Sequence, residues 1–562
     1  MKILRLKKSN CKNCYRCIRE CPVKSIKFSD HQAHIIDDEC ILCGRCVVTC
    51  PQNAKSVIDS TDQVKSAIRA GKRVIAAVAP SFIADFSVSG IGELEASLQK
   101  LGFFAAEETA IGAYIVKTEY EKMIREGKQD VIISTCCTSV VRLVQKYYPA
   151  AVKYLAHVLS PMQAHAADIK RRYPDAYVVF IGPCIAKKAE GDEAGSYTDA
   201  VLTFDELREW AAEQEVTLES DSEPLSEDQK RSRFFPSTGG IIKSMDKQEG
   251  FRYIAVDGVK RCMRALESVL NGDLTQCFLE MSACEGSCIG GPATRKYKEH
   301  MLRSEERVTL SADGTVDFDW AREVPLDRKI DPEYEQPLFP GEAEIRKILA
   351  QMGKTKPEDE LNCGTCGYNT CREKALAVYQ GKADVTMCLP FMKEKAESFS
   401  NIIIENSPNA IMVLDAQLNV SQLNEAACEL FGIEEPASVL NTNVITLMDP
   451  QEYAEVLASE KPILNRKCYL PKYEKYVEEF IIYYKDSDIL ISILKDITKE
   501  EQEAEKAQKM RLDTVEATDR VIDKQMTAVQ EIASLLGETV AETKVVLTKL
   551  KNTILSEEKR DE

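Results

Sequence analysis

The pattern of apolar and polar positions divides the chain into stretches with different periodicities. Between residues 70 and about 335, short apolar runs such as VIAAVAP, VIISTCC and YVVFIGPC alternate with longer amphipathic stretches such as ELEASLQKLGF. Short apolar runs separated by helical stretches are typical of strands joined by helices. The pattern therefore predicts an α/β domain in this region.

Residues 396–500 predict a small α+β module instead. AIMVLDAQLNVSQLN indicates two strands joined by a polar turn, AACELFGI a short helix, and EEFIIYYKDSDILISILKDIT a second hairpin. The segment around residues 327–342, DRKIDPEYEQPLFPGE, is rich in Pro and in charge and predicts a linker after the α/β domain.

From residue 501 onward the pattern is that of a helix. This stretch contains no Pro and a single Gly, and its apolar residues recur at alternating spacings of about three and four. The apolar positions, which Thr543 interrupts, are Ile522, Met526, Val529, Ala533, Leu536, Val540, Leu547, Leu550 and Ile554. The spacing predicts a coiled-coil signalling helix and therefore a homodimer. The alternative is a helix that packs back on the domain before it.

The composition is that of an acidic globular protein with several domains. At ~150 residues per domain, the length of 562 residues predicts about three to five domains. Hydrophobic residues make up 44% and charged residues 29%, which excludes a fully disordered chain. The net charge of −17 disfavours nucleic acid and anionic membranes as partners. No stretch has the ~20 apolar residues of a membrane helix, and MKILRLKKSN lacks an apolar signal core, so we expect a cytoplasmic protein.

Cysteine is abundant, with 21 residues against 5 His and 2 Trp. Because no export signal is apparent, a disulfide framework is not expected, and the thiols are better explained as metal ligands. The scarcity of His disfavours zinc enzymes and haem and favours iron–sulfur clusters. Such clusters imply an oxygen-poor environment.

The first 60 residues contain two copies of the spacing C-x2-C-x2-C-x3-C-P, which is that of bacterial two-cluster ferredoxins. The fourth cysteine of each run reaches the other cluster in this arrangement. One [4Fe–4S] cluster is therefore expected on Cys11, Cys14, Cys17 and Cys50. The other is expected on Cys40, Cys43, Cys46 and Cys21. The alternative is a zinc-binding or disulfide-linked module. Two close clusters would transfer electrons between them and on to a redox partner further along the chain.

Three short loops in the α/β region also carry cysteine. Residues 134–138 (STCCT) end one strand, residues 182–188 (GPCIAKK) follow another, and residues 280–292 (EMSACEGSCIGGP) form the third loop. Open α/β sheets place their sites at the carboxyl ends of strands, where the first two loops fall. Cysteines from separate loops can thus converge on one buried cofactor.

At these loops the chain resembles the [FeFe]-hydrogenases. All three loops are similar to the signature loops of that family's catalytic domain and occur in the same order, behind a ferredoxin domain that many members carry. The resemblance covers roughly residues 1–335 and implies a two-lobed α/β domain. It also implies an H-cluster, in which a [4Fe–4S] cubane is joined through a cysteine sulfur to a diiron subsite with CO, CN and azadithiolate ligands.

The resemblance assigns roles to residues that match the family's motifs. The cubane ligands would be Cys137, Cys184, Cys284 and Cys288, and Cys288 would also bridge to the diiron unit. Lys187 matches the lysine that hydrogen-bonds one cyanide, where a cation suits a buried anionic ligand.

Other residues match positions around the diiron unit. Ala79, Pro80 and Ser81 match the loop that meets the other cyanide, and Cys136 matches the thiol that shuttles protons. The alternatives are an inert buried Cys136 and a surface Lys187. Residues 238–240 (TGG) either line the cofactor or form a simple turn. Cys262 and Cys277 match no motif and are expected in the core.

The chain departs from the catalytic pattern at several places. Gly182 and Ser282 stand where Met is common, which should leave room or water beside the cofactor, and Met162 stands where Gln is usual. Of the proton-relaying carboxylates, Glu119 is retained, whereas Lys122 and Ala156 replace later steps. Because a proton relay needs an unbroken series of titratable groups, the resemblance implies slow turnover.

A further cluster and a sensor module are expected after the linker. Cys363, Cys366, Cys371 and Cys388 resemble the small [4Fe–4S] domain of corrinoid iron–sulfur proteins, with four-thiolate zinc as the alternative. Residues 396–500 resemble a PAS domain, which binds a ligand or only mediates dimerisation. No His follows His300, which excludes a His-ligated haem there. Cys428 and Cys468 are expected to be core residues.

These patterns together predict a multidomain α/β and α+β protein. Its domains are a ferredoxin-like 2[4Fe–4S] domain at 1–60, a two-lobed hydrogenase catalytic domain at 61–335, a small [4Fe–4S] domain at 345–395, a PAS domain at 396–500 and a coiled-coil helix at 501–562.

The resemblance implies a hydrogenase that reversibly oxidises H2 or reduces protons, slowly, as a hydrogen or redox sensor. A ferredoxin-type carrier would exchange electrons with it. The tail contains neither a phosphoacceptor His nor a nucleotide loop, so its output would pass to a kinase, phosphatase or regulator. The alternatives are a metabolic ferredoxin-linked hydrogenase and a non-catalytic hydrogenase-like iron–sulfur protein.

Overall fold

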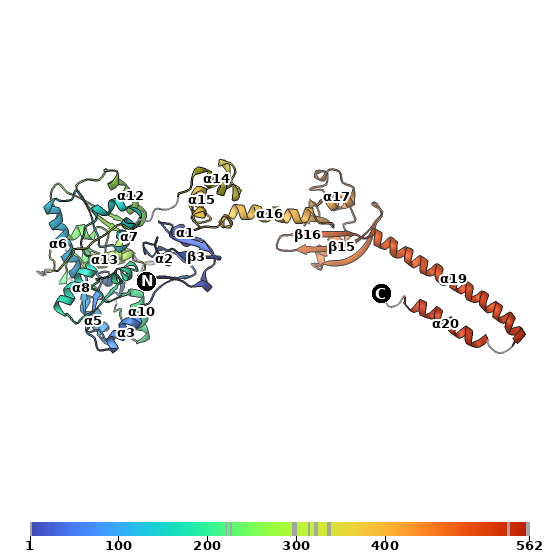
Figure 1. The fold of residues 1–562 in the computed structure, drawn as a ribbon, viewed down its shortest axis with the longest axis horizontal. Coiled ribbons are helices and arrows are strands. Elements are labelled where there is room, and N and C mark those ends of the chain that lie inside the picture. The colour runs from blue at the N-terminus through green and yellow to red at the C-terminus, as the bar shows by residue number, and fades with distance from the viewer. Residues whose placement is uncertain are drawn as a thin grey trace. The chain divides into compact units, whose positions relative to one another are not determined.

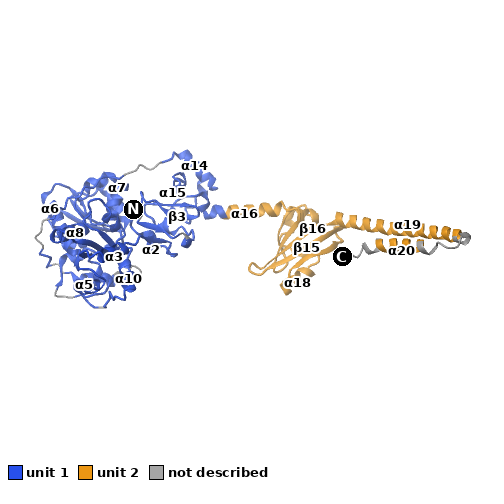
Figure 2. Cartoon of the chain, turned by 60° about the horizontal axis from the view of Figure 1, so that its bottom comes forward, with its two compact units in different colours: residues 1–392 blue, residues 393–562 orange. Residues whose placement is uncertain are grey.

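The computed structural model describes residues 3–220, 222–224, 228–294, 301–312, 315–319, 324–333, 339–536 and 540–557. The chain forms two compact units, residues 1–392 and 393–562 (Figure 2). The division falls within helix α16 (Leu389–Glu405). No helix among the described residues is both long and apolar enough to span a bilayer.

The first 60 residues fold around two short antiparallel ribbons. Strand β1 (Leu4–Leu6) pairs with β4 (Lys55–Val57), and β2 (Ile26–Ser29) pairs with β3 (Gln32–Ile35). The short helices α1 (Arg16–Glu20) and α2 (Arg45–Val48) each contain the third cysteine of one motif. This is the ferredoxin-like domain that the cysteine spacing predicted.

The α/β region contains two parallel sheets, so the predicted two lobes are confirmed. The first has the order β6-β5-β8-β9, with β5 Val74–Val78, β6 Ala105–Glu108, β8 Tyr177–Gly182 and β9 Ala200–Thr203. The second has the order β10-β11-β7, with β7 Val131–Ile133, β10 Arg252–Asp257 and β11 Cys277–Ser282. The runs VIAAVAP, VIISTCC and YVVFIGPC contain β5, β7 and β8.

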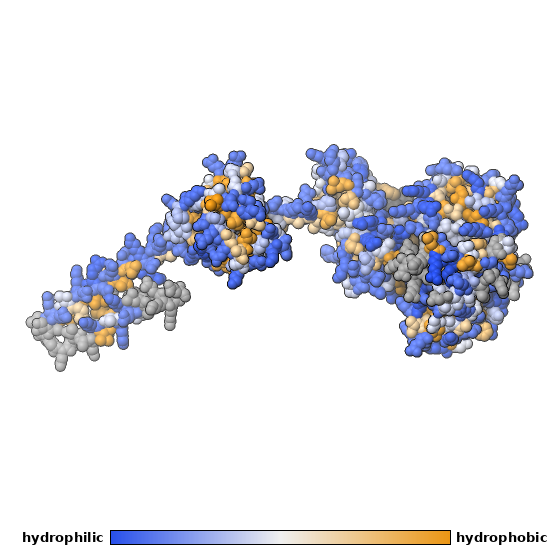
Figure 3. All heavy atoms as spheres, turned by 180° about the vertical axis from the view of Figure 1, so that it is seen from behind, coloured by the Kyte–Doolittle hydropathy of each residue, from blue (hydrophilic) through white to orange (hydrophobic). Residues whose placement is uncertain are grey.

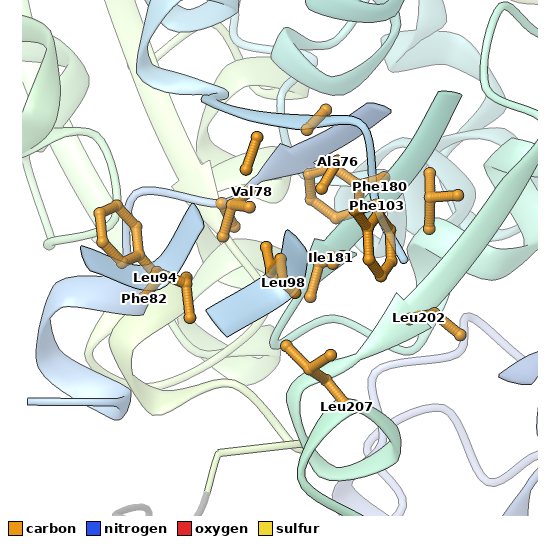
Figure 4. Packing of buried hydrophobic residues seen from close by; sticks show 14 of the residues in the cluster. Ala76, Val78, Phe82, Leu94, Leu98, Phe103, Phe180, Ile181, Leu202 and Leu207 are labelled. Atoms are coloured by element: carbon orange, nitrogen blue, oxygen red, sulfur yellow. The ribbon is translucent and has the colours of Figure 1, made fainter. Parts of the chain in front are cut away.

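Helices surround both sheets (Figure 1). They are α3 Thr61–Arg69, α4 Phe82–Asp85, α5 Ile91–Lys100, α6 Ala110–Glu126, α7 Thr138–Tyr147, α8 Pro161–Arg172, α9 Ala186–Gly191, α10 Phe204–Glu213, α11 Gly240–Ser244, α12 Val259–Leu270 and α13 Met301–Ser311. Every residue of β5 is buried, as expected for a parallel strand covered on both faces. Leu94 and Leu98 of α5 and Leu207 of α10 belong to the core around this sheet (Figure 4). The hydrophobic cores around the two sheets fix the ends of the strands, from which the cysteine loops extend.

A small helical domain follows, formed by α14 (Glu342–Gln351), α15 (Cys371–Tyr379) and the start of α16. Its residues Cys366, Tyr368, Ala377 and Met387 share one hydrophobic core with Ile18 and neighbouring residues of the ferredoxin-like domain. The small domain is therefore packed directly on the ferredoxin-like domain.

The second unit contains a five-stranded antiparallel sheet in the order β13-β12-β16-β15-β14. The strands are β12 Ala410–Asp415, β13 Val420–Leu423, β14 Ile463–Leu470, β15 Lys475–Tyr484 and β16 Ile489–Asp496, with helices α17 Glu425–Phe431 and α18 Gln451–Ser459. Both predicted hairpins are present, as β12–β13 and β15–β16, and α17 is the predicted short helix. The predicted PAS fold is thus confirmed.

The C-terminal region forms two helices, α19 (Thr498–Leu536) and α20 (Val540–Glu557), where the sequence predicted one continuous seam. They lie side by side (Figure 1), and Lys551 pairs with Asp519 at 3.0 Å between side-chain N and O atoms, so α20 runs back along α19. The seam positions Ala533, Leu536, Val540 and Ile554 lie outside the described side chains. The coiled coil and the dimer therefore both stay predictions, with the helical region divided into α19 and α20.

Candidate functional site

The three cysteine loops meet between the two lobes. The loop at 134–138 follows β7 and the loop at 280–292 begins at the end of β11, both in the second sheet. The loop at 182–188 follows β8 in the first sheet. The carboxyl ends of β7 and β11 lie at one edge of the second sheet, which brings two of the loops together. The loop after β8 comes from the first sheet and lines the same cavity as the other two.

A cavity of about 110 Å³ lies among these loops. All four cysteines that the resemblance assigns to the cubane line it: Cys137, Cys184, Cys284 and Cys288. Burial raises the pKa of the Cys184 thiol to about 11, and the neighbouring Cys137 adds to this effect while Lys187 opposes it. Burial likewise raises the pKa of Cys284 and Cys288. Buried thiols become good ligands when a metal centre supplies the positive charge that a thiolate needs.

The donor set suits an iron–sulfur cluster, because all four donors are thiols that border one cavity. In the described part of the chain, no group of three or more His, Cys, Asp or Glu side chains is placed to hold a single metal ion. The four thiols border a space instead. Four cysteine thiols around a cavity are the ligand set that a [4Fe–4S] cubane requires.

Lys187 also lines the cavity, and a buried carboxylate holds its ammonium group. Lys187 Nζ lies 2.5 Å from Glu190 Oε2, and Glu190 is 1% exposed. Ser160 and Thr138 donate hydrogen bonds to the same carboxylate, and Arg328 lies 3.8 Å from it. Burial alone would raise the pKa of Glu190, but the charges of Lys187 and Arg328 and these hydrogen bonds hold it below its ordinary value. Glu190 therefore stays ionised and fixes the lysine.

The loop at 79–81 forms another part of the wall. Ala79, Pro80 and Ser81 all line the cavity, and the Ala79 N–H donates to the Ile181 carbonyl at 2.8 Å. The buried Ser81 Oγ has no hydrogen-bond partner among the described residues. An unpartnered hydroxyl at a cavity wall is suited to an exogenous polar ligand, because leaving it unpaired costs free energy.

Gly182 and Ser282, which stand where Met is common, differ in their position relative to the cavity. Gly182 is absent from the cavity lining, and a Cβ placed on it would lie 2.7 Å from the Phe180 ring. Phe180 does line the cavity, so aromatic carbon takes the place where we expected open room. Ser282 lines the cavity, and its Oγ is 2.9 Å from Ser287 Oγ.

Cys136 lines the cavity beside the predicted ligand Cys137, and burial raises the pKa of its thiol to about 12. Its hydrogen-bond partner is Tyr120, with Sγ and Oη 3.3 Å apart. The structure does not place Glu119 there. Glu119 pairs with Lys122 at 3.1 Å, keeps 28% of its side chain exposed and is not part of the cavity lining.

Sequence reasoning missed both Tyr120 and Glu190. Ala113 of α6 lines the cavity, and residues three, four and seven positions further along a helix share its face. Tyr120 follows Ala113 by seven positions, so helical spacing could have placed Tyr120, rather than Glu119, toward the loops. Glu190 gave no comparable signal, because a lone Glu resembles a surface residue.

The ferredoxin-like domain reaches the same cavity. Leu42 and Cys43 line it, and Cys43 is a predicted cluster ligand. The next residue, Gly44, has φ +73°, and a Cβ there would lie 2.4 Å from Pro292 Cβ. Only glycine allows this close approach of the second cysteine motif to the third loop.

The four cysteines of the small domain differ in exposure. Cys363 is exposed, Cys371 is half-buried, and Cys366 and Cys388 are buried. The domain is tied to the ferredoxin-like domain by Lys24 Nζ, which donates to the Gly367 carbonyl at 3.0 Å, and by the pair of Lys382 with Glu39 at 2.7 Å. Cys262 and Cys277 are buried in a core, as expected, whereas Cys428 and Cys468 are half-buried.

Family models match most of the chain. Residues 3–63 match a 4Fe–4S dicluster domain, residues 72–292 the C-terminal domain of the iron-only hydrogenase large subunit, residues 359–390 a putative Fe–S cluster domain, and residues 401–466 the PAS fold. The chain therefore combines a hydrogenase-like domain with iron–sulfur domains and a PAS domain, as the motifs predicted.

Individual proteins match the chain at low identity or over a short segment. Iron hydrogenase 1 of Clostridium pasteurianum is 24% identical over 369 residues, which span 52% of this chain and 64% of that protein. The chain thus covers slightly less than two thirds of that relative. One component of an ion-translocating oxidoreductase complex from Methanosarcina acetivorans is 41% identical over 44 residues, or 8% of this chain and 17% of that protein.

Solved structures also match parts of the chain. An [FeFe]-hydrogenase variant from Chlamydomonas reinhardtii has a TM-score of 0.40 and 15% identity, covering 50% of this chain and all of that one (100%). The PAS domain of an HTR-like protein from Haloarcula marismortui has a TM-score of 0.16 and 20% identity, covering 19% of this chain and 95% of that one.

Proposed function

We propose, from the premise that this chain carries an iron-only hydrogenase domain together with two iron–sulfur domains and a PAS domain, that it is a sensory [FeFe]-hydrogenase. It would bind an H-cluster, turn over H2 and protons slowly, and pass the resulting redox change to a signalling partner. The observation that carries the proposal is the single cavity lined by Cys137, Cys184, Cys284, Cys288 and Lys187.

The residues around the cavity suit this cofactor. The four thiols would hold the cubane, with Cys288 also bridging to the diiron unit. When bound, the H-cluster supplies the chemistry that splits H2 into protons and electrons. Lys187, held by Glu190, would donate a charge-assisted hydrogen bond to one cyanide, and Ser81 would donate to the other.

Electrons would leave through the ferredoxin-like domain. Cys43 lines the cavity, so the cluster on Cys40, Cys43, Cys46 and Cys21 would neighbour the cubane. Cys21 and Cys366 belong to one hydrophobic core, which supports transfer onward to the cluster of the small domain. The cluster on Cys11, Cys14, Cys17 and Cys50 would be available to a ferredoxin-type carrier.

The link to signalling is helix α16. It begins at Leu389, directly after the predicted ligand Cys388, and ends at Glu405, shortly before the first strand of the PAS sheet. A redox change at this cluster would therefore act on the start of a helix that leads into the PAS domain. For a signal to result, the oxidised and reduced clusters must favour different conformations of that helix.

Infrared spectroscopy of holoprotein reconstituted with the diiron unit tests the cofactor. Bands of bound CO and CN are expected, and H2 should change them. Their absence after reconstitution would contradict a catalytic-type cofactor and favour a non-catalytic iron–sulfur protein. High turnover with reduced ferredoxin, without any H2-dependent effect on a partner kinase or phosphatase, would instead indicate a metabolic hydrogenase.

A further inference from the structure

Lys374 is a fully buried lysine in the small helical domain. It is 2% exposed and lies on α15 three positions after the predicted ligand Cys371, so the two side chains share one face of the helix. Lys374 Nζ donates a hydrogen bond to the Val385 carbonyl at 2.9 Å. Among the described residues, no carboxylate forms an ion pair with this ammonium group. Because a buried charge is costly unless it is paired, this position calls for a counter-charge.

The predicted cluster ligands surround this ammonium group. Three of the four cysteines assigned to the cluster act on the charge of Lys374: Cys388, Cys366 and Cys371. Burial lowers the pKa of Lys374, and these thiolates and Asp384 oppose that effect. The Asp384 carboxylate is itself occupied, since it accepts the Thr386 N–H at 2.8 Å and the Thr386 hydroxyl at 2.5 Å. A [4Fe–4S] cluster on four thiolates is anionic, so the residues present fit a group that would supply the counter-charge.

We infer that Lys374 is the counter-charge of the small-domain cluster, that it stabilises the reduced form of that cluster, and that it connects the charge of the cluster to the start of α16. This inference rests on the proposed function, in which a [4Fe–4S] cluster occupies the four cysteines of the small domain. It names the residue through which a redox change would reach the helix that leads to the PAS domain.

The effect on reduction follows from charge. Reduction by one electron, which the neighbouring ferredoxin-like cluster would supply and thereby lose, adds one negative charge beside Lys374. An ammonium group in a buried site attracts that charge strongly, because little water lies between them to screen it. Lys374 therefore favours the reduced form, and its removal should lower the reduction potential.

The connection to α16 follows from hydrogen bonds around Val385. The Val385 carbonyl accepts the Lys374 ammonium and also the N–H of the predicted ligand Cys388, at 3.3 Å. The Cys388 carbonyl in turn accepts the Met392 N–H at 2.9 Å, in the first turn of α16. When added negative charge attracts the ammonium group, its bond to the Val385 carbonyl weakens. The turn that precedes α16 is therefore less constrained in the reduced protein.

A redox titration followed by EPR spectroscopy tests the effect on the potential. The full chain would carry its iron–sulfur clusters but no diiron unit, and the signal that is lost in Cys366→Ser identifies the small-domain cluster. In Lys374→Met, the ratio of reduced to oxidised cluster at the wild-type midpoint should fall at least about tenfold, which is about 59 mV for one electron. Lys374→Arg retains the charge and should keep the wild-type potential.

Two further variants separate charge from structure. Lys374→Gln keeps a donor for the Val385 carbonyl but not the charge, so it should lower the potential as well, and it replaces Lys374→Met if that variant does not fold. Lys347→Met removes an exposed lysine of α14 in the same domain, whose charge water screens, and should leave the potential unchanged. An unchanged potential in a folded Lys374→Met or Lys374→Gln protein would overturn the inference.

Hydrogen–deuterium exchange tests the connection to α16. The amides of residues 385–392 should exchange at least about twofold faster in the reduced than in the oxidised wild-type protein, with each protein poised far from its own midpoint. Lys374→Met should lose this difference, whereas Lys347→Met should keep it. Equal exchange in oxidised and reduced wild-type protein would rule out the connection.

These measurements distinguish failure of the inference from failure of the proposed function. Both need only the iron–sulfur clusters, so they decide the role of Lys374 even where infrared spectroscopy shows no CO or CN bands. A small domain that binds zinc and gives no reducible signal would exclude both the fourth cluster and the role of Lys374. A reducible cluster whose potential does not depend on Lys374 would overturn the inference alone.

Discussion

Some residues around the cavity face it, and others lie behind these residues and hold their side chains in place. Lys187 and Ser81 face it, whereas Glu190 lies behind Lys187 and accepts hydrogen bonds from several neighbours. Glu280, on β11, is also buried, and it accepts the Ile242 N–H at 3.0 Å. Because buried charges are costly unless paired, each of these carboxylates has a measurable effect on stability.

Glu190→Gln should destabilise the first unit by about 3 kcal/mol, because the buried ammonium of Lys187 and the neighbouring Arg328 lose their counter-charge. Anaerobic urea unfolding measures this change. The matched control is Glu193→Gln, whose carboxylate also pairs with Arg328 but is 47% exposed, and it should cost at most about 1 kcal/mol. Equal losses in the two variants would show that burial of the Lys187 pair has no special role.

The buried carboxyl of Glu280 should make the unfolding free energy depend on pH. Burial raises the pKa of Glu280 to about 7, although backbone N–H groups around Ile242 oppose this rise. The folded state thus favours the protonated acid. Its stabilising effect is complete below the ordinary pKa of about 4.3 and is lost as pH rises through 7. Between pH 5 and pH 8 the unfolding free energy should fall by about 2–3 kcal/mol from this group.

Glu280→Gln is the test of that pH dependence. The amide cannot ionise, so the difference in unfolding free energy between wild type and variant should change over pH 5–8 and level off above. A difference that stays constant across this range would contradict the raised pKa.

Among the elements, the loops that connect strands to helices carry the site, and glycine sets how closely they approach. The motif containing Cys43 touches the third loop through Gly44 and Pro292, and Gly367 brings the small domain within van der Waals distance of Ile18. In both places the backbone has a positive φ and a Cβ would meet a neighbour. These contacts set how closely the cysteine-bearing segments approach one another.

Gly44→Ala should separate the ferredoxin-like domain from the third loop. The added Cβ meets Pro292, so we expect a loss of about 1–3 kcal/mol beyond the cost of the positive φ, and slower electron transfer to the active site. Gly71→Ala is the matched control, because Gly71 has φ +71° but no atom within 4 Å of its Cβ position. Stopped-flow reduction and urea unfolding measure both effects; a match between the two variants would rule out the steric contact.

At the scale of the whole molecule, the chain joins a unit with hydrogenase-like and iron–sulfur domains to a unit that contains a PAS domain. The surface is mainly hydrophilic with scattered apolar residues (Figure 3). Met510, Val521 and Ile532 of α19 are apolar and exposed, which agrees with a role for the C-terminal helices in binding another chain. The small domain packs on the ferredoxin-like domain, and its last cysteine directly precedes α16, which leads along the chain to the PAS domain.

Cys366→Ser should uncouple sensing from turnover. Loss of the fourth cluster should lower the iron content by about four atoms per chain, keep H2 turnover with an artificial donor, and abolish any H2-dependent effect on the partner. Iron analysis, H2 assays and partner assays measure these results. Cys428→Ser, outside all predicted ligand sets, should leave iron content unchanged. A Cys366→Ser protein that keeps its H2 response would exclude this cluster from the signalling path.

The sequence by itself determined the order and type of the domains, because cysteine spacing and apolar periodicity are local properties that the chain carries in consecutive residues. It also singled out the cysteines that line the cavity. Only the tertiary structure decided that Tyr120 rather than Glu119 contacts Cys136, that Glu190 holds Lys187, and that Phe180 fills the space at Gly182. It likewise decided that α20 turns back along α19. These features depend on which faces of separate elements meet, and packing between distant segments sets that arrangement.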